Sequence, residues 1–213
     1  MIKNTIKKIV TGKWKENCYV ISNPTKEALL IDPGNDKNII EDYIIIKKLR
    51  VCAILNTHAH MDHIGAIEYF QNKYKVPFFI HSDDEKLLKS ANLYVKIFDG
   101  SGSIKIPQID FYFDKINLIE LITNFNVKII HTPGHTLGSV CILIDDNLFT
   151  GDTLFINEIG RTDLPGGNKK KLDNSLKLLA KMPKNIKIYP GHGTMSSLEK
   201  ILISNDQFKK AIE

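Results

Sequence analysis

Four potential metal-binding side chains fall within six consecutive residues of this 213-residue chain. They are His58, His60, Asp62 and His63 in the run Thr57-His58-Ala59-His60-Met61-Asp62-His63. Imidazole nitrogens and carboxylate oxygens are the donors that zinc and other divalent transition metals accept in proteins. The chain has only seven histidines, so three of them in this run indicate metal binding and not a polar surface turn.

The spacing of these four residues suits two metals better than one. In an extended loop, His58 and His60 project to the same side of the backbone. Asp62 and His63 stand at the entry to a predicted helix, where they can turn toward a second point nearby. We therefore interpret the run as a contribution to a dinuclear site.

Three more potential ligands each follow an apolar run and a glycine. The motifs are Thr132-Pro133-Gly134-His135, Thr150-Gly151-Asp152 and Tyr189-Pro190-Gly191-His192. Glycine allows the backbone to turn sharply and to approach a bound ion closely. A carboxylate such as Asp152 can offer one oxygen to each of two cations, at the separation where a hydroxide bridges them. We predict that His135, Asp152 and His192 complete the site.

The elements that must position these residues follow an α/β pattern, because short apolar runs alternate with helix-like segments. The first three runs have only turn residues between them, which predicts an antiparallel start to a sheet. The expected strands are 6–10, 18–21, 28–31, 51–55, 78–80, 109–113, 116–122, 127–130, 140–144, 148–150 and 186–189. The expected helices are 38–49, 64–74, 83–91, 172–181 and one near Leu198, with irregular segments at 92–107 and 157–171.

Composition narrows the class of protein. Hydrophobic residues make up 43% of the chain and charged residues 25%, as in ordinary globular proteins, and the length suits one domain over 1–213. The formal charge is +5, but the lysines are scattered, so we expect no nucleic-acid partner. The sequence has no run of 18 apolar residues and no signal-like N-terminus, so we expect no membrane span and a cytoplasmic location.

The three cysteines, Cys18, Cys52 and Cys141, lie in strand-like runs, and this is typical of buried reduced thiols.

In their order and context, the seven residues resemble the metallo-β-lactamase superfamily, specifically its glyoxalase II-like branch of short thiolesterases. The resemblance extends from Asn17-Cys18-Tyr19 and Asp32-Pro33-Gly34 to Gly191-His192-Gly193. It implies a four-layer αβ/βα sandwich. It also implies the ligand sets: one metal held by His58, His60 and His135, the other by Asp62, His63 and His192, with Asp152 bridging.

The stretch from Ile159-Gly160-Arg161 to Gly166-Gly167 resembles the loop of the glyoxalase II-like and persulfide dioxygenase branches. We interpret Arg161 and Asp163 as an ion pair that shapes this loop. His81 and His131 are interpreted as ordinary histidines outside the site.

The expected reaction is hydrolysis of a small acyl thioester by hydroxide that two divalent metals generate, with Asp62 and Asp152 as the catalytic carboxylates. The metal is expected to be zinc, with iron or manganese as alternatives. Lactoylglutathione is the first expected substrate, although the C-terminal helical domain that binds glutathione in two-domain glyoxalase II has no counterpart before Glu213. Two alternatives stay open: a mononuclear iron persulfide dioxygenase that uses His58, His135 and Asp152, and a non-catalytic metal-binding protein.

Overall fold

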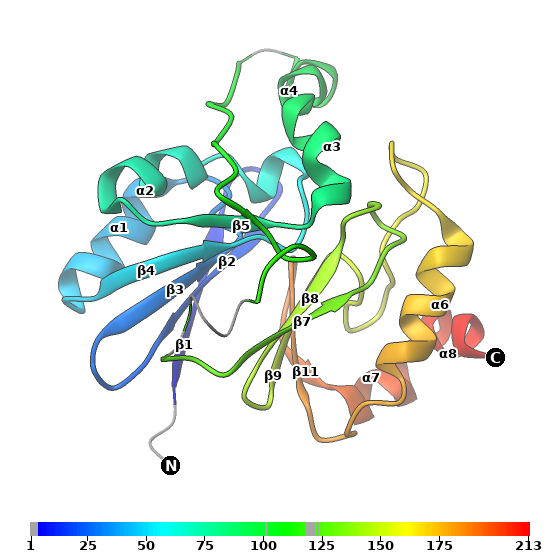
Figure 1. The fold of residues 1–213 in the computed structure, drawn as a ribbon. Helices are drawn as coiled ribbons and strands as arrows, with labels where there is room; N and C mark the ends of the chain where they lie inside the picture. The colour runs from blue at the N-terminus through cyan, green and yellow to red at the C-terminus, as the bar shows by residue number, and fades with distance from the viewer. Residues whose placement is uncertain (1–3, 101, 118–121, 123) are drawn as a thin grey trace. The chain divides into compact units, whose positions relative to one another are not determined.

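The computed structural model of the chain describes residues 4–100, 102–117, 122 and 124–213. It forms two compact units, residues 1–125 and 126–213, and each is described here by itself. Figure 1 shows the strands and helices of both units in chain order. A single domain over residues 1–213 stays a prediction.

The first unit is built on a six-stranded sheet in the order β1-β2-β3-β4-β5-β6. The β1–β2 and β2–β3 pairs are antiparallel, and the β3–β4, β4–β5 and β5–β6 pairs are parallel. The predicted antiparallel start is therefore confirmed. The strands are β1 (Thr5–Thr11), β2 (Glu16–Ser22), β3 (Glu27–Ile31), β4 (Arg50–Leu55), β5 (Phe78–Ile80) and β6 (Phe111–Tyr112).

The helices of the first unit differ from the expected ones mainly at their ends. They are α1 (Lys37–Ile46), η1 (Met61–His63), α2 (Ile67–Tyr74), η2 (Ser82–Asp84), α3 (Glu85–Lys89) and α4 (Ala91–Asp99). The prediction of irregular structure from residue 92 was wrong as far as Asp99. Ala91 and Val95 are buried one helical turn apart, so the segment has a packed face. Gly100, with φ of 75°, is the C-cap that ends α4.

Two expected strands also need revision. The expected strand 109–113 is reduced to the two residues of β6. Of the expected strand 116–122, residues 118–121 lie outside the described part of the chain.

The core of the first unit explains the apolar runs of its central strands. Every residue of β2 and β3 is buried. Ile40 and Ile44 of α1 and Phe70 of α2 belong to the same buried cluster as Leu30 and Ile54 of the sheet. Successive side chains of a strand point to opposite faces, so strands that are buried on both faces carry apolar residues at successive positions.

The second unit is built on a five-stranded sheet in the order β11-β10-β9-β8-β7. The β7–β8 and β8–β9 pairs are antiparallel, as predicted, whereas β9 and β10 are parallel. Asp145, with φ of 53°, lies in the expected turn between β8 and β9. The strands are β7 (Val127–His131), β8 (Val140–Ile144), β9 (Asn147–Gly151), β10 (Lys187–Pro190) and β11 (Ser196–Ser197).

Three helices accompany this sheet: α6 (Lys169–Leu179), α7 (Leu198–Ser204) and α8 (Asp206–Ile212). Helix α6 begins three residues before the expected start because the Asn168 side chain accepts a hydrogen bond from Lys171 N–H and caps it. The sequence predicted one final helix, but there are two, since Asn205 ends α7 and caps α8. Leu172, Leu176 and Phe208 are fully buried in one cluster.

The cysteines lie in strands as expected, with one difference. Cys18 in β2 and Cys141 in β8 are buried, whereas Cys52 in β4 is partly exposed, and all three are free thiols. Cys52 lies near the start of β4, where the burial pattern alternates. Burial raises the pKa of Cys141 to about 12, so its sulfur stays a thiol near neutral pH.

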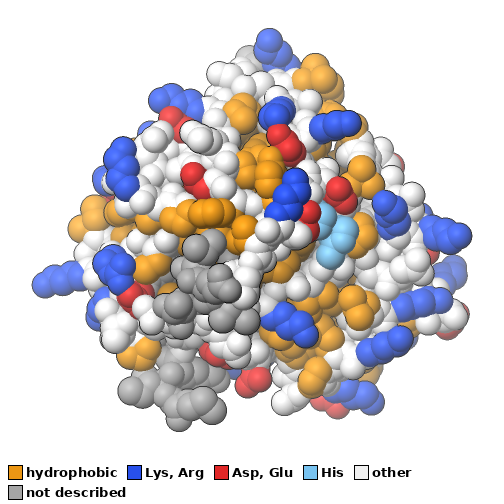
Figure 2. Space-filling model, viewed as in Figure 1, with side chains coloured by type: hydrophobic (Ala, Val, Ile, Leu, Met, Phe, Trp, Pro, Cys, Tyr) orange, Lys and Arg blue, Asp and Glu red, His pale blue; other side chains and the backbone are white. Residues whose placement is uncertain are grey.

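The sequence predicted scattered charges and no membrane span, and the described residues bear on both. On the face shown in Figure 2, Lys and Arg side chains are interspersed with acidic, hydrophobic and uncharged ones. Among the described residues, none of the helices has the length and apolar character needed to cross a bilayer.

We expect Leu176→Ala to lower the free energy of unfolding by about 2–5 kcal/mol, because it removes a fully buried side chain from the α6 core. Leu178→Ala, two residues away on the same helix, is the matched control. Its side chain is 47% exposed, so a change within about 0.5 kcal/mol is expected. Urea titration followed by circular dichroism measures both. Equal effects would show that the inner face of α6 is assigned wrongly.

Candidate metal centre

The histidine-rich loop of the first unit follows β4 at an edge of the sheet that also carries the end of β3. Because β3 and β4 are parallel neighbours, Asp32, which follows β3, lies beside Thr57, which follows β4. Oδ1 of Asp32 accepts a hydrogen bond from Thr57 N–H at 2.7 Å, and Oδ2 accepts one from the Thr57 hydroxyl at 2.5 Å. A buried carboxylate therefore fixes the point where the loop leaves the sheet.

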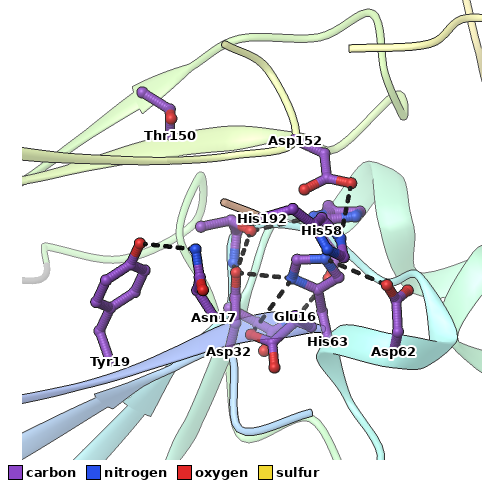
Figure 3. Close-up of polar contacts among 12 residues, drawn as sticks. Glu16, Asn17, Tyr19, Asp32, His58, Asp62, His63, Thr150, Asp152 and His192 are labelled. Carbon is purple, nitrogen blue, oxygen red and sulfur yellow. Dashed lines mark hydrogen bonds and ion pairs between the residues drawn. The ribbon is translucent and has the colours of Figure 1, made fainter. Parts of the chain in front are cut away.

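Asp32 also orients a predicted metal ligand. Nδ1 of His63 lies 3.1 Å from Oδ2 of Asp32, as drawn in Figure 3. A carboxylate can only accept, so His63 carries its proton on Nδ1 and presents the lone pair of Nε2. A carboxylate behind a histidine in this way fixes the ring and the tautomer of a metal ligand.

His58 has the same tautomer for a related reason. Its Nδ1 lies 3.1 Å from the hydroxyl oxygen of Thr57, whose own proton is used on Asp32. That oxygen therefore accepts from Nδ1 of His58, and Nε2 carries the lone pair. The Asp32-Thr57 pair thus sets the orientation of two predicted ligands.

The four predicted ligands of the first unit lie close to one another. The ring centroid of His58 is 4.9 Å from that of His60 and 4.2 Å from that of His63. Oδ2 of Asp62 lies 3.8 Å from Nε2 of His63. Donor atoms around one cation about 2 Å away lie roughly 3–4 Å apart, so Asp62 and His63 have the spacing of two ligands of one ion.

Main-chain contacts hold the loop in this shape. A Cβ atom at Gly34 would collide with the carbonyl oxygen of Asp62, so only glycine fits there. Ala59 N–H, between His58 and His60, donates to Oδ2 of the buried Asp84 at 2.9 Å. The loop is therefore held from β3 on one side and from the segment after β5 on the other.

Sequence reasoning missed Glu16, a buried carboxyl group at the start of β2. Its Oε2 accepts from the Thr11 hydroxyl at 2.7 Å, and its Oε1 lies 4.0 Å from Nδ1 of His63 (Figure 3). Burial raises the pKa of Glu16 well above its ordinary value, and His63 opposes this only in part. A charged residue directly before the buried Asn17-Cys18-Tyr19 strand was the available signal.

In the second unit, two parallel strands bring Asp152 and His192 together. Gly191 N–H, after β10, donates to the carbonyl oxygen of Gly151, at the end of β9, at 2.8 Å. The next residue of each segment is a predicted ligand. Nε2 of His192 consequently lies 3.6 Å from Oδ2 of Asp152.

His135 joins the same carboxylate. Its Nε2 lies 3.6 Å from Oδ2 of Asp152, and its Nδ1 lies 2.9 Å from the carbonyl oxygen of Arg161. A carbonyl can only accept, so Nδ1 is protonated and Nε2 carries the lone pair. A Cβ at Gly160 would collide with the Asp152 carbonyl, which explains the glycine in this loop.

The loop that contains Arg161 is shaped by the ion pair that the sequence predicted. Nε and Nη2 of Arg161 donate to the two carboxylate oxygens of Asp163 at 2.8 and 2.7 Å. The guanidinium hydrogen bonds hold the pKa of Asp163 at about 2. Both side chains are exposed, so the pair defines the shape of the loop more than its stability.

His81 and His131 each have a local hydrogen-bond partner, and their place outside the site stays a prediction. Nδ1 of His81 accepts from Asp83 N–H at 3.2 Å and caps η2. Nε2 of His131 lies 2.9 Å from the carbonyl oxygen of Leu137.

The donor set of both units fits divalent metals. His58, His63 and His135 each present Nε2, with Nδ1 held by an oxygen of the protein. Asp62 and Asp152 add hard carboxylate oxygens. Mixed imidazole and carboxylate donors accept zinc, iron and manganese.

The structure thus groups four of the seven predicted residues in the first unit and three in the second. That all seven form one site stays a prediction.

A cavity of about 450 Å³ opens beside the three ligands of the second unit. Its lining includes Phe155, Ile156 and Ile159 together with polar groups. Cavities of this size and mixed character are typical of small-molecule sites.

The comparisons with known proteins agree with this geometry. Residues 11–192 match the family model of the metallo-beta-lactamase superfamily. The chain belongs to this superfamily, and the expected fold class is confirmed. Membership and the histidine and aspartate clusters together indicate a metal-dependent enzyme.

Two curated relatives cover most of the chain. A probable metallo-hydrolase, YqgX of Bacillus subtilis, is 34% identical over 210 residues, which is 94% of this chain and 94% of that protein. The hydroxyacylglutathione hydrolase GloC of Haemophilus influenzae is 30% identical over 193 residues, 87% of this chain and 89% of that protein.

Two solved structures have the same fold. The B3 metallo-beta-lactamase BLEG-1 matches with a TM-score of 0.89 and 30% identity, covering 96% of this chain and 99% of that one. TTHA1623, solved in a di-iron-bound form, matches with a TM-score of 0.85 and 29% identity, covering 94% and 99%.

We expect Asp32→Asn to weaken metal binding about 10- to 100-fold, because an amide cannot supply all three of the acceptor contacts to Thr57 and His63. Competition with a chromophoric chelator measures the affinity. Asp36→Asn, at the exposed start of α1, is the control, because asparagine keeps an oxygen that can accept from Gly12 N–H, and it should bind metal as the wild type does. Unchanged affinity in Asp32→Asn would contradict the role given to Asp32.

Proposed function

We propose that this protein is a metal-dependent hydrolase that cleaves a small acyl thioester of the hydroxyacylglutathione type. The observation that carries the proposal is the contact between the loop 159–167 and the ligands of the second unit. Arg161 accepts a hydrogen bond from His135, and Gly160 packs on Asp152. The part of the sequence that resembles thiolesterases therefore contacts the residues that would hold metal. The similarity to GloC supports the same reaction.

The proposal assigns the seven residues to two cations. His58, His60 and His135 would hold one, and Asp62, His63 and His192 the other, with Asp152 bridging. The spacing of 3.8 Å between Asp62 and His63 supports the second set. Zinc is the proposed metal, with iron or manganese as alternatives; TTHA1623, with its two irons, supports a pair of metals and keeps iron open.

Bound metals would lower the pKa of a nearby water toward neutrality and polarise the substrate carbonyl. Asp62, partly exposed, would accept a hydrogen bond from the attacking water and orient it. In the reaction a C–O bond forms, the C–S bond breaks and the thiolate takes up a proton, so the products are a carboxylic acid and a thiol. Phe155, Ile156 and Ile159 would contact the acyl group in the cavity.

The proposed partner is therefore a small thioester, without nucleic acid or membrane. The proposed location is the cytoplasm, where such thioesters of small thiols occur under reducing conditions.

We expect Asp152→Ala to lower thioesterase kcat/KM by about 100-fold or more, since metal-assisted stabilisation of the reaction is worth several kcal/mol. The assay follows thiol release from a thioester panel by metal-loaded enzyme. Asp146→Ala removes a carboxylate from the exposed turn before β9 and should leave the activity unchanged. Full activity in metal-replete Asp152→Ala would refute the proposed mechanism.

Metal analysis distinguishes thioester hydrolysis from the alternative, oxidation of a persulfide. We expect two metal ions per chain in protein purified without added metal, with thioester cleavage that is independent of oxygen. If the protein instead holds one iron per chain and consumes oxygen when a persulfide is added, the proposed hydrolase activity is wrong and the protein is a persulfide dioxygenase. Two bound metals without turnover of any thioester would also overturn the proposal.

A further inference from the structure

Asn205 is a buried amide between α7 and α8, 13 residues after His192, the last predicted ligand in the chain. Its side chain is fully buried. Oδ1 accepts from Phe208 N–H at 2.8 Å and caps α8. This cap uses only the oxygen of the amide.

The amide nitrogen of Asn205 makes hydrogen bonds to a segment earlier in the chain. Nδ2 donates to the carbonyl oxygens of Phe155 at 3.1 Å and Glu158 at 2.9 Å. Both amide hydrogens are therefore directed at one turn, 47 and 50 residues earlier in the chain. Gln207 of α8 adds a weaker contact, in which its Oε1 accepts from Ile159 N–H at 3.4 Å.

The turn that Asn205 holds is a small hairpin. Phe155 N–H donates to the Glu158 carbonyl at 3.0 Å, and Leu154 pairs with Ile159 in an antiparallel bridge. A further hydrogen bond, from Gly160 N–H to the Thr153 carbonyl at 3.1 Å, and the buried Leu154 side chain hold the base of the hairpin. The contacts from Asn205 hold its tip, because they reach the carbonyls of Phe155 and Glu158.

This hairpin forms one side of the cavity beside the metal-binding residues. Phe155, Ile156 and Ile159 all line it, and the Phe155 ring lies 6.3 Å from the His192 ring. The chain then continues to Arg161, whose carbonyl holds His135. The position of the hairpin thus determines the space for a substrate.

We propose that Asn205 is a positioning residue that holds the 155–159 hairpin in place and thereby determines which acyl groups the enzyme accepts. This inference rests on the proposed function for the identity of the substrate. The three apolar side chains of the hairpin would contact the acyl chain of the thioester, so the length of that chain is the property that they would discriminate.

The test uses Asn205→Asp and Asn205→Ser in the full-length, metal-loaded protein. Both replacements keep an oxygen that caps α8, but neither can donate to both carbonyls. Asn168→Asp and Asn168→Ser are the matched controls, because Asn168 caps α6 through the same kind of contact with Lys171 N–H. Circular dichroism checks that helix content is kept, and the serine variant avoids a buried charge.

The first measurement is hydrogen exchange in peptides covering residues 155–160. We expect exchange about tenfold faster or more in both Asn205 variants, because neither variant makes both hydrogen bonds to the hairpin carbonyls. The second measurement is kinetics with a series from acetyl to octanoyl thioesters of one thiol. KM should rise about tenfold for the longer acyl groups, with kcat and metal content kept and the Asn168 variants unchanged.

Exchange at wild-type rates in folded Asn205 variants would overturn the proposal, as would an equal loss of kcat on every thioester. The exchange measurement needs no substrate. If the wild type cleaves none of the thioesters, the proposed function fails, and exchange still decides the role of Asn205.

Discussion

Three of the five predicted histidine ligands are oriented in the same way: a hydrogen-bond acceptor holds Nδ1, so that Nε2 is left to bind metal. The three acceptors differ. They are the carboxylate of Asp32 for His63, the hydroxyl of Thr57 for His58 and the main-chain carbonyl of Arg161 for His135. Each acceptor is itself fixed by a neighbouring strand or loop. The fold therefore determines the chemistry of the donors before any metal is present.

Three buried carboxyl groups of the first unit make different hydrogen bonds behind the predicted ligands. Asp32 fixes two imidazoles, and Asp84 fixes the main chain between His58 and His60. Glu16 lies further back and bonds to Thr11. Side chains behind the predicted ligands therefore determine the orientation of those ligands. Such groups are difficult to replace, because removing one partner leaves a buried polar atom without compensation.

The sequence was sufficient to select the residues that the structure groups within each unit and to place most strands, but not to find the residues behind them. His58, His60, Asp62 and His63 were predicted because their types and spacing are rare, and the structure groups them. Asp84 and Asn205 were missed because each is an ordinary residue at a helix start, and its importance arises from a partner far along the chain. Helix α8 was missed for the same reason, since Asn205 gives no local sign that it ends one helix and begins another. The combination of residues from the two units into one site was implied only by resemblance and stays a prediction.

The hydrogen bond between Gly191 and Gly151 has a consequence for variation within the family. It joins main-chain atoms at the ends of two parallel strands, so the separation of Asp152 and His192 follows from the spacing of neighbouring strands, about 4.8 Å. The other side chains of β9 and β10 do not determine the distance between Asp152 and His192. A substitution in either strand that leaves the two strands paired would therefore leave the distance between the two donors unchanged.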